Sequence, residues 1–171
     1  MPRILAIDPG TAQSAWLFFE DGRPNHFGMY PNAELLDCIR KPADDLATFK
    51  EGLDLVVIET IEPRYGLRMG WETLDTSRYI GKLEEASRPL PVVLLKRSDI
   101  LRHLGVVTSP RKGEKRVSAD SGMKQALVDR YGGKDAAIGS KASPGPLYGI
   151  AKDVWSALAI AVTAVDLGVA G

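Results

Sequence analysis

The chain has 171 residues, of which 44% are hydrophobic and 26% charged, which is typical of one globular domain with a substantial core. Lys plus Arg and Asp plus Glu both number 22, so overall charge indicates neither an acidic nor a basic partner. The single cysteine, Cys38, excludes an internal disulfide and a cysteine-rich metal site. We expect one domain over residues 1–171, without a signal peptide or a membrane-spanning run, in the cytoplasm.

Aliphatic and aromatic runs predict five strands, at residues 3–8, 14–20, 24–30, 53–59 and 90–96. Tight turns join the first three, which predicts an antiparallel meander. Helices are predicted over 33–41, 42–50, 71–87, 123–131 and 151–167, with a short helix after 98; Asn32 and Ser98 are the expected N-caps. Residues 105–122 and 132–149 are expected to be loops. This order predicts an α/β fold, a mixed five-stranded sheet with helices on both faces.

Three acids have unusual positions. Asp8 and Glu59 each end a run of buried aliphatics, and Asp153 opens the last predicted helix. If the two strands are neighbours, both carboxylates emerge at one edge of the sheet. Carboxylates brought together repel each other unless a cation joins them, and hard oxygen ligands suit Mg²⁺ or Mn²⁺. Two such ions about 4 Å apart support phosphodiester hydrolysis.

A simpler interpretation of the same acids stays open at this point. Asp153 is then an N-cap, Asp8 satisfies its own turn, and Glu59 is solvated.

Three segments together resemble the RuvC-type Holliday junction resolvases of the RNase H-like superfamily. They are "ILAIDPGTAQSAW" (4–16), "LVVIET" (55–60) and "AKDVWSALAIAV" (151–162). Residues 63–86 resemble the helix that such enzymes set against the junction and the partner subunit, and "SGMKQALVDRYGG" and "SPGPLYGI" resemble the phage-type branch of the family. The resemblance implies an RNase H-like nuclease domain in which Asp8, Glu59 and Asp153 bind Mg²⁺ or Mn²⁺ and are catalytic. It also implies a homodimer that nicks a four-way DNA junction symmetrically, in a bacterial or infected host cell.

The chain departs from the family pattern at one position. The resemblance implies a fourth acidic or His/Asp position three residues after Asp153, but Ser156 stands there. Either three acids suffice or a nearby group assists, with Glu62 and Ser156 as candidates. Lys152 either stabilises charge on the phosphate or faces solvent.

The DNA-facing residues are expected at 64–71, at 111–116 and at 124. Residues 96–116 carry seven Lys and Arg against two acids, which predicts a basic surface. The candidates for DNA contact are Arg64, Tyr65, Arg68, Trp71, Arg111, Lys112, Lys115, Arg116 and Lys124. Tyr65 and Trp71 are candidates to stack at the junction centre, and Trp71 is equally a candidate dimer or core contact. Trp16 and Trp155 are expected to be core residues.

Three other functions compete with junction resolution. "IDPGT" also resembles the phosphate-binding turn of sugar-kinase or actin-like ATPases, but those folds duplicate the domain and need a second such turn. A non-catalytic junction-binding protein and a nuclease of broader range, acting on flaps and forks, are the other two. Metal-dependent cleavage separates the enzyme from the ATPase and the binder, and a panel of DNA structures separates the two nucleases.

Overall fold

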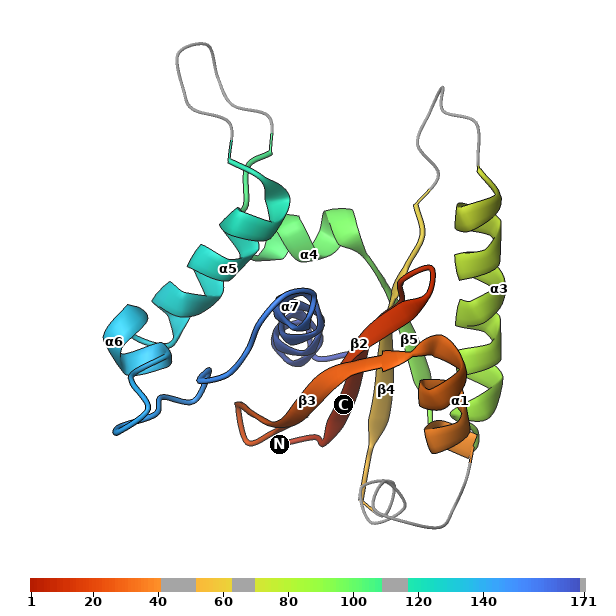
Figure 1. Ribbon diagram of the computed structural model, residues 1–171, viewed down its shortest axis with the longest axis horizontal. Coiled ribbons are helices and arrows are strands. Elements are labelled where there is room, and N and C mark those ends of the chain that lie inside the picture. The colour runs from red at the N-terminus through yellow and green to blue at the C-terminus, as the bar shows by residue number, and fades with distance from the viewer. Residues whose placement is uncertain (41–51, 63–69, 109–116, 170–171) are drawn as a thin grey trace.

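The structure, a computed structural model, describes residues 1–40, 52–62, 70–108 and 117–169. Its five strands are β1 (Ile4–Asp8), β2 (Gln13–Glu20), β3 (Arg23–Pro31), β4 (Leu55–Thr60) and β5 (Val92–Lys96). They form one sheet in the order β3-β2-β1-β4-β5 (Figure 1). β1, β4 and β5 run parallel, whereas β2 and β3 pair antiparallel as a meander with β1. The predicted mixed sheet is confirmed.

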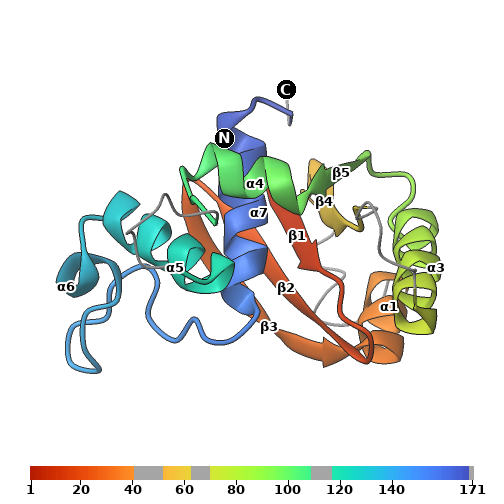
Figure 2. The ribbon, with the colours of Figure 1, turned by 90° about the horizontal axis from the view of Figure 1, so that it is seen from above.

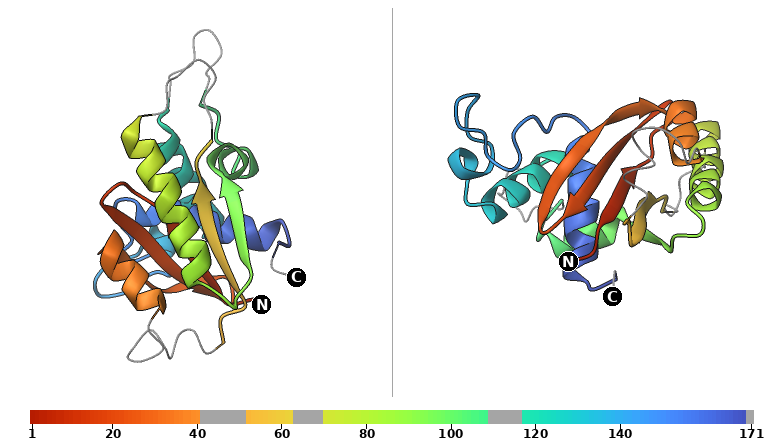
Figure 3. Two further views of the ribbon diagram at one scale, coloured as in Figure 1. Left: turned by 90° about the vertical axis from the view of Figure 1, so that its right-hand side faces the viewer. Right: turned by 90° about the horizontal axis from the view of Figure 1, so that it is seen from below.

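Helices cover both faces of this sheet, also as predicted. One face carries α1 (Asn32–Arg40) and α3 (Trp71–Ala86), which lie side by side (Figure 3). The other carries α4 (Arg97–His103), α5 (Ala119–Arg130), the short α6 (Lys134–Ala137) and α7 (Val154–Asp166). Seen from above, α7 lies across the middle of its face, with α4 and α5 beside it (Figure 2).

Strand alternation divides the core into two layers. Ile4 and Ala6 of β1 belong to the layer under α7, whereas Leu5 and Ile7 belong to the layer under α1 and α3. α7 has no charged residue before Asp166, and eleven of its thirteen residues are buried. A helix that is apolar all round is typical of the centre of a fold, because other elements surround it. β1, β2, α4 and α5 all pack against α7, which therefore lies at the centre of the fold.

Two helix starts differ from the sequence prediction. α5 begins at Ala119 rather than residue 123, because the Ser118 hydroxyl accepts a hydrogen bond from the Ser121 amide at 3.2 Å and caps the helix. α4 begins at Arg97, so the predicted N-cap role of Ser98 is wrong. Ser98 lies inside the first turn, where its hydroxyl donates to Glu62.

The last helix and the loop before it also differ from prediction. α7 begins at Val154 rather than residue 151, because Lys152 has a positive φ of 50°, which a helix does not contain. The predicted loop 132–149 contains α6. The helix predicted over 42–50 lies outside the described residues. Across 1–40, 52–62, 70–108 and 117–169, the structure has no helix with the length and apolarity needed to span a bilayer.

Candidate active site

The parallel pairing of β1 with β4 brings two of the three acids together. Ile7 pairs with Ile58, so Asp8 and Glu59 are the next residues along neighbouring strands and lie at the same edge of the sheet. Side chains alternate along a strand, which places both carboxylates on the face of Ala6 and Val57. That is the face covered by α7. The edge-of-sheet expectation for the first two acids is confirmed.

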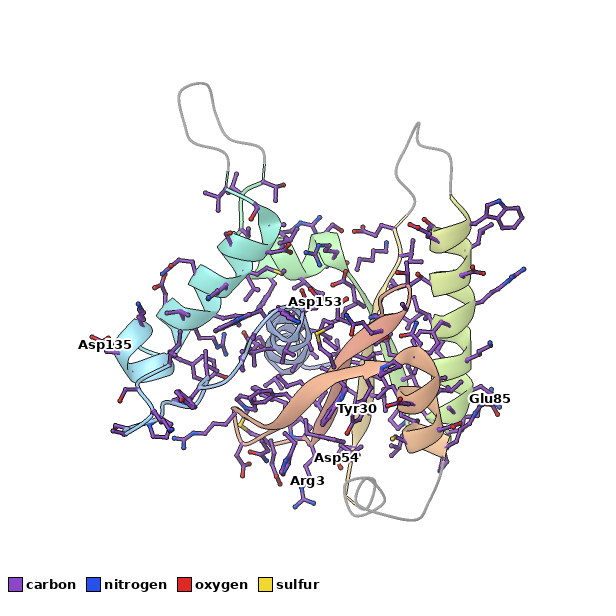
Figure 4. All side chains as sticks on the ribbon, in the orientation of Figure 1. Arg3, Tyr30, Asp54, Glu85, Asp135 and Asp153 are labelled. Atoms are coloured by element: carbon purple, nitrogen blue, oxygen red, sulfur yellow. The ribbon has the colours of Figure 1, made fainter. Side chains whose placement is uncertain are left out.

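α7 brings the third acid to this edge. Asp153 immediately precedes the helix, with φ −71° and ψ −8°, and its side chain makes no capping hydrogen bond. Asp153 therefore occupies the N-cap position, as the simpler interpretation predicts, but its side chain does not cap the helix and its carboxylate is exposed. Figure 4 shows Asp153 at one end of the sheet and Arg3 and Asp54 at the other. Arg3 and Asp54 lie beside the beginnings of β1 and β4, where the Arg3 amide donates to Asp54 at 2.8 Å.

Electrostatic coupling links the three acids. The pKa of Asp8 is raised to about 7, chiefly by burial and then by repulsion from Glu59 and, more weakly, from Asp153. The positive charge of Arg97 and, more weakly, the Ser156 hydroxyl oppose the rise of this pKa. Ser156 is 7% exposed and lies three residues after Asp153, so the same side of α7 reaches Asp8. Ser156, which stands where the family pattern has a fourth acid, thus acts on Asp8, an acid of the site.

A guanidinium that the sequence analysis did not assign lies against Glu59. Arg97 Nη1 is 3.3 Å from both carboxylate oxygens of Glu59, and its Nη2 donates to Asp120 on α5. Burial raises the pKa of Glu59, and Arg97 is the main influence that lowers it. Arg97 directly follows β5, Asp8 ends β1 and Glu59 is the last residue but one of β4, so a search for charged residues at strand ends points to Arg97 as well. No comparable sequence feature indicates Asp120, because its position relative to Arg97 depends on where α5 begins.

Glu62 has a structural partner. Its two carboxylate oxygens accept hydrogen bonds from the amide and the hydroxyl of Ser98, at 2.9 and 2.6 Å. A carboxylate at this place satisfies one free backbone amide at the start of α4. Consecutive residues of α4, Arg97 and Ser98, therefore hold Glu59 near the end of β4 and Glu62 just after it.

The turn behind Asp8 is fixed by Asn32. The Asn32 amide donates to the carbonyl oxygens of Gly10 and Thr11 at 3.0 and 3.3 Å, and accepts from the Ser14 hydroxyl at 2.7 Å. The Gly10 amide in turn donates to Ser14 Oγ at 3.4 Å. A side chain at Gly10 would meet the Gln13 carbonyl oxygen, because a Cβ built there lies 2.3 Å from it. This network sets the direction in which the chain leaves Asp8.

The predicted DNA-facing residues are described only in part. Trp71, the first residue of α3, is 78% exposed, so within this chain it is not a core residue. Lys124 on α5 is exposed, and its Nζ lies 5.3 Å from the ring centre of Trp155, which is buried as predicted, like Trp16. Lys152 is exposed. The remaining candidates, Arg64, Tyr65, Arg68, Arg111, Lys112, Lys115 and Arg116, lie outside the described residues.

The acids of this edge have the donor chemistry of a hard divalent cation. Asp8, Glu59 and Asp153 offer carboxylate oxygens only, the ligand type that Mg²⁺ and Mn²⁺ prefer. In the part of the chain that the structure describes, no three acids, histidines or cysteines lie close enough to form a complete metal site as placed. The repulsion that raises the pKa of Asp8 is the condition that a cation relieves. The donor set therefore fits such an ion.

Comparison with solved structures gives this arrangement a context. The fold is similar to that of Thermus thermophilus RuvC in complex with a Holliday junction substrate, with a TM-score of 0.60 and 15% identity over 100% of this chain and 97% of that one. A second Thermus thermophilus RuvC structure matches with a TM-score of 0.54 and 15% identity, over 97% and 96% of the two chains. No protein-family model and no curated protein matches the sequence. The chain has the RuvC-type, RNase H-like fold.

Proposed function

We propose that this chain is a divalent-metal-dependent endonuclease that resolves four-way DNA junctions. The observation that carries the proposal is the convergence of Asp8, Glu59 and Asp153 at one edge of a RuvC-type sheet, close enough for the last two to raise the pKa of the first. Structural acids are normally paired or solvated, whereas a strongly shifted carboxyl among other carboxyls is typical of a reactive site. One of the similar structures is a RuvC bound to a Holliday junction, which supports the choice of substrate.

The roles of the residues follow from their chemistry. Asp8, Glu59 and Asp153 hold Mg²⁺ or Mn²⁺, which when bound supplies an activated water and a counter-charge for the phosphate. The Ser156 hydroxyl lowers the pKa of Asp8 and so favours the ionised carboxylate. His103, one of the two histidines, bonds Asp166 at the opposite end of α7 from Asp153, so it is not the base. Lys152 faces solvent and takes no part.

Binding of DNA is assigned to basic and aromatic side chains other than the three acids. Lys124 and the basic residues of segment 109–116 neutralise phosphates, which makes the affinity fall as salt rises. Trp71 offers an exposed ring for stacking on a base at the branch. A homodimer supplies two active sites for symmetric nicks. We further propose that residues 1–171 form one nuclease domain of the phage-type branch, acting in the cytoplasm of a bacterial or infected host cell.

Cleavage of a labelled synthetic four-way junction tests the proposal. The junction is incubated with Mg²⁺, Mn²⁺ or EDTA, beside a linear duplex, a fork and a flap of matched sequence. We expect paired nicks on opposing strands of the junction, only with a metal, and an intact duplex. Equal cutting of forks and flaps would indicate a nuclease that acts on branched DNA in general and not a junction resolvase. Binding without cutting under both metals would leave a non-catalytic junction-binding protein.

Variants of the three acids tie the activity to this site. Asp8→Asn, Glu59→Gln and Asp153→Asn are each expected to abolish cutting while leaving junction binding largely intact, because phosphate contacts provide most of the affinity. Asp135→Asn is the matched control, since Asp135 is an exposed acid on α6, well away from Asp153 in Figure 4. Loss of binding rather than cutting in the acid variants would contradict their assignment as metal ligands.

A further inference from the structure

Arg97 contacts two carboxylates at unequal distances. Its Nη1 is shared between both oxygens of Glu59 at 3.3 Å each, whereas its Nη2 makes a much shorter contact with one oxygen of Asp120. A shared bond at 3.3 Å is longer than an ordinary charge-assisted hydrogen bond, so the Glu59 side is the weaker of the two. The guanidinium therefore lies between two carboxylates, with Asp120 the nearer and Glu59 the more distant partner.

The two carboxylates differ in burial in the opposite sense. The side chain of Glu59 is 14% exposed, that of Arg97 is 29% exposed and that of Asp120 is 79% exposed. An acid as buried as Glu59 needs a counter-charge, whereas Asp120 is well solvated and does not. Arg97 thus compensates Glu59 electrostatically while Asp120 determines where the guanidinium is held.

Around Arg97 there is space for it to move. An open pocket of about 630 Å³ is lined by Glu62, Arg97, Ser98, Leu101, Thr108, Val117, Ser118 and Ala119. Arg97 is one of the lining residues and is bound to Asp120, which follows Ser118 and Ala119 of the same lining, so the pocket offers its side chain room on that side. A second cation arriving at Glu59 would compete for the same oxygen lone pairs and repel the guanidinium.

We infer that Arg97 is an exchangeable positioning residue, which occupies Glu59 until a divalent cation replaces it and is then retained on Asp120. The inference rests on the proposed function for the cation, and assigns new roles to Arg97 and Asp120. It makes Arg97 a competitor of the metal and Asp120 the residue that weakens this competition. Removing each of them should then change metal affinity in opposite directions.

Calorimetric titration of the DNA-free protein with Mn²⁺ tests the exchange without measuring cutting. Arg97→Gln removes the competitor and is expected to bind Mn²⁺ about tenfold more tightly than the unsubstituted protein. Asp120→Asn leaves Arg97 with Glu59 as its partner and is expected to bind Mn²⁺ several-fold more weakly. Arg97→Lys, which keeps the charge without the two-pronged guanidinium, should fall between Arg97→Gln and the unsubstituted protein.

The double variant separates exchange from a simple effect of charge. If Asp120 acts through Arg97, adding Asp120→Asn to Arg97→Gln changes the Mn²⁺ affinity little; if it acts only as a distant charge, the two effects add. Arg102→Gln is the control, because Arg102 forms an exposed pair with Asp99 on the same helix, and its affinity should be unchanged. Thermal melts establish that each variant is folded.

These outcomes distinguish failure of the exchange at Arg97 from failure of the proposed nuclease function. Opposite shifts with a non-additive double variant support the exchange. Additive shifts, or unchanged affinity in Arg97→Gln, overturn it while leaving the nuclease proposal intact. Absence of Mn²⁺ binding by the unsubstituted protein overturns both the exchange and the metal dependence of the proposed function.

Discussion

The side-chain amide of Asn32 lies 3.0 Å from the carbonyl oxygen of Gly10, although 22 residues separate them in sequence. Through this bond the first residue of α1 holds the turn that follows Asp8. The Ser14 hydroxyl completes the arrangement by donating to Asn32 and accepting from the Gly10 amide. One amide thus satisfies three groups around a turn that carries an acid of the site.

Replacing Asn32 with Ala is expected to loosen this turn. The carbonyl of Gly10 and the hydroxyl of Ser14 lose a partner in a partly buried place, which costs roughly 1–3 kcal/mol in the free energy of unfolding. Cutting should slow roughly tenfold, because Asp8 is less firmly placed. Urea denaturation and single-turnover cleavage measure the two effects. Asn25→Ala, which removes only an exposed bond to Glu20, should change neither; a similar loss in both variants would contradict the role of Asn32.

Asp8 should make stability depend on pH in an unusual direction. Its pKa is about 7 in the folded protein against 3.8 ordinarily, so between these values the folded state binds a proton that the unfolded state releases. Its contribution to stability is therefore complete below about pH 4 and is lost as pH rises to 7. The charged groups acting on it are Glu59, Arg97 and Asp153.

The variant Asp8→Asn removes this loss, because an amide does not ionise. The free energy of unfolding of the variant and of the unsubstituted protein is measured by urea denaturation in EDTA at pH 5 and at pH 8. The advantage of the variant should be roughly 1–3 kcal/mol larger at pH 8 than at pH 5. Asp135→Asn, at an exposed position, should show no such difference. A gain that is the same at both pH values would mean that Asp8 is not held at a raised pKa.

Glu62 is expected to matter for stability and not for cutting. Glu62→Ala removes the acceptor for the amide and hydroxyl of Ser98, and should cost about 1 kcal/mol by leaving the start of α4 without its carboxylate. The cutting rate should stay within a few-fold of the unsubstituted protein, in contrast to Glu59→Gln. Denaturation and cleavage are measured on the same preparations. An inactive Glu62→Gln of normal stability would instead place Glu62 among the metal ligands.

Lys152 is expected to matter through its backbone. Its φ of 50° is strained for a residue with a side chain, so Lys152→Gly should raise the free energy of unfolding by roughly 0.5 kcal/mol, and Lys152→Val should lower it by about 1–2 kcal/mol. Lys152→Gly should still cut, because the ammonium group faces solvent. Lys141→Gly, at an exposed loop position, should bring no gain. Loss of cutting in a stable Lys152→Gly would assign the ammonium group to the phosphate.

The strand pattern and the three acids could be predicted because each is a local feature. An aliphatic run followed by a carboxylate is visible over a few residues, and the paired strands then place Asp8 and Glu59 together. The start of α5 is also local, but the Ser118 cap follows a basic segment whose composition favours a loop, and the cap was missed.

The groups that hold the acids could not be predicted, because they come from distant parts of the chain. Arg97 is 38 residues from Glu59 and 23 from Asp120, and Asn32 meets Gly10 across 22 residues. The end of the fifth strand indicates that Arg97 lies at this edge, but nothing in the neighbouring sequence indicates which acids it contacts. These partners are defined by the sheet order, which places β5 next to β4 and the end of β3 next to the turn after β1.

The central position of α7 also has a consequence for synthesis of the protein. A nascent chain that has emerged only as far as β5 has made Asp8 and Glu59 but neither Asp153 nor the helix that covers Ala6 and Val57. Such a product exposes an apolar sheet face, which favours its aggregation and removal. The three acids meet only when the last helix docks, so a prematurely terminated product carries an incomplete acid set and is expected to lack the proposed nuclease activity.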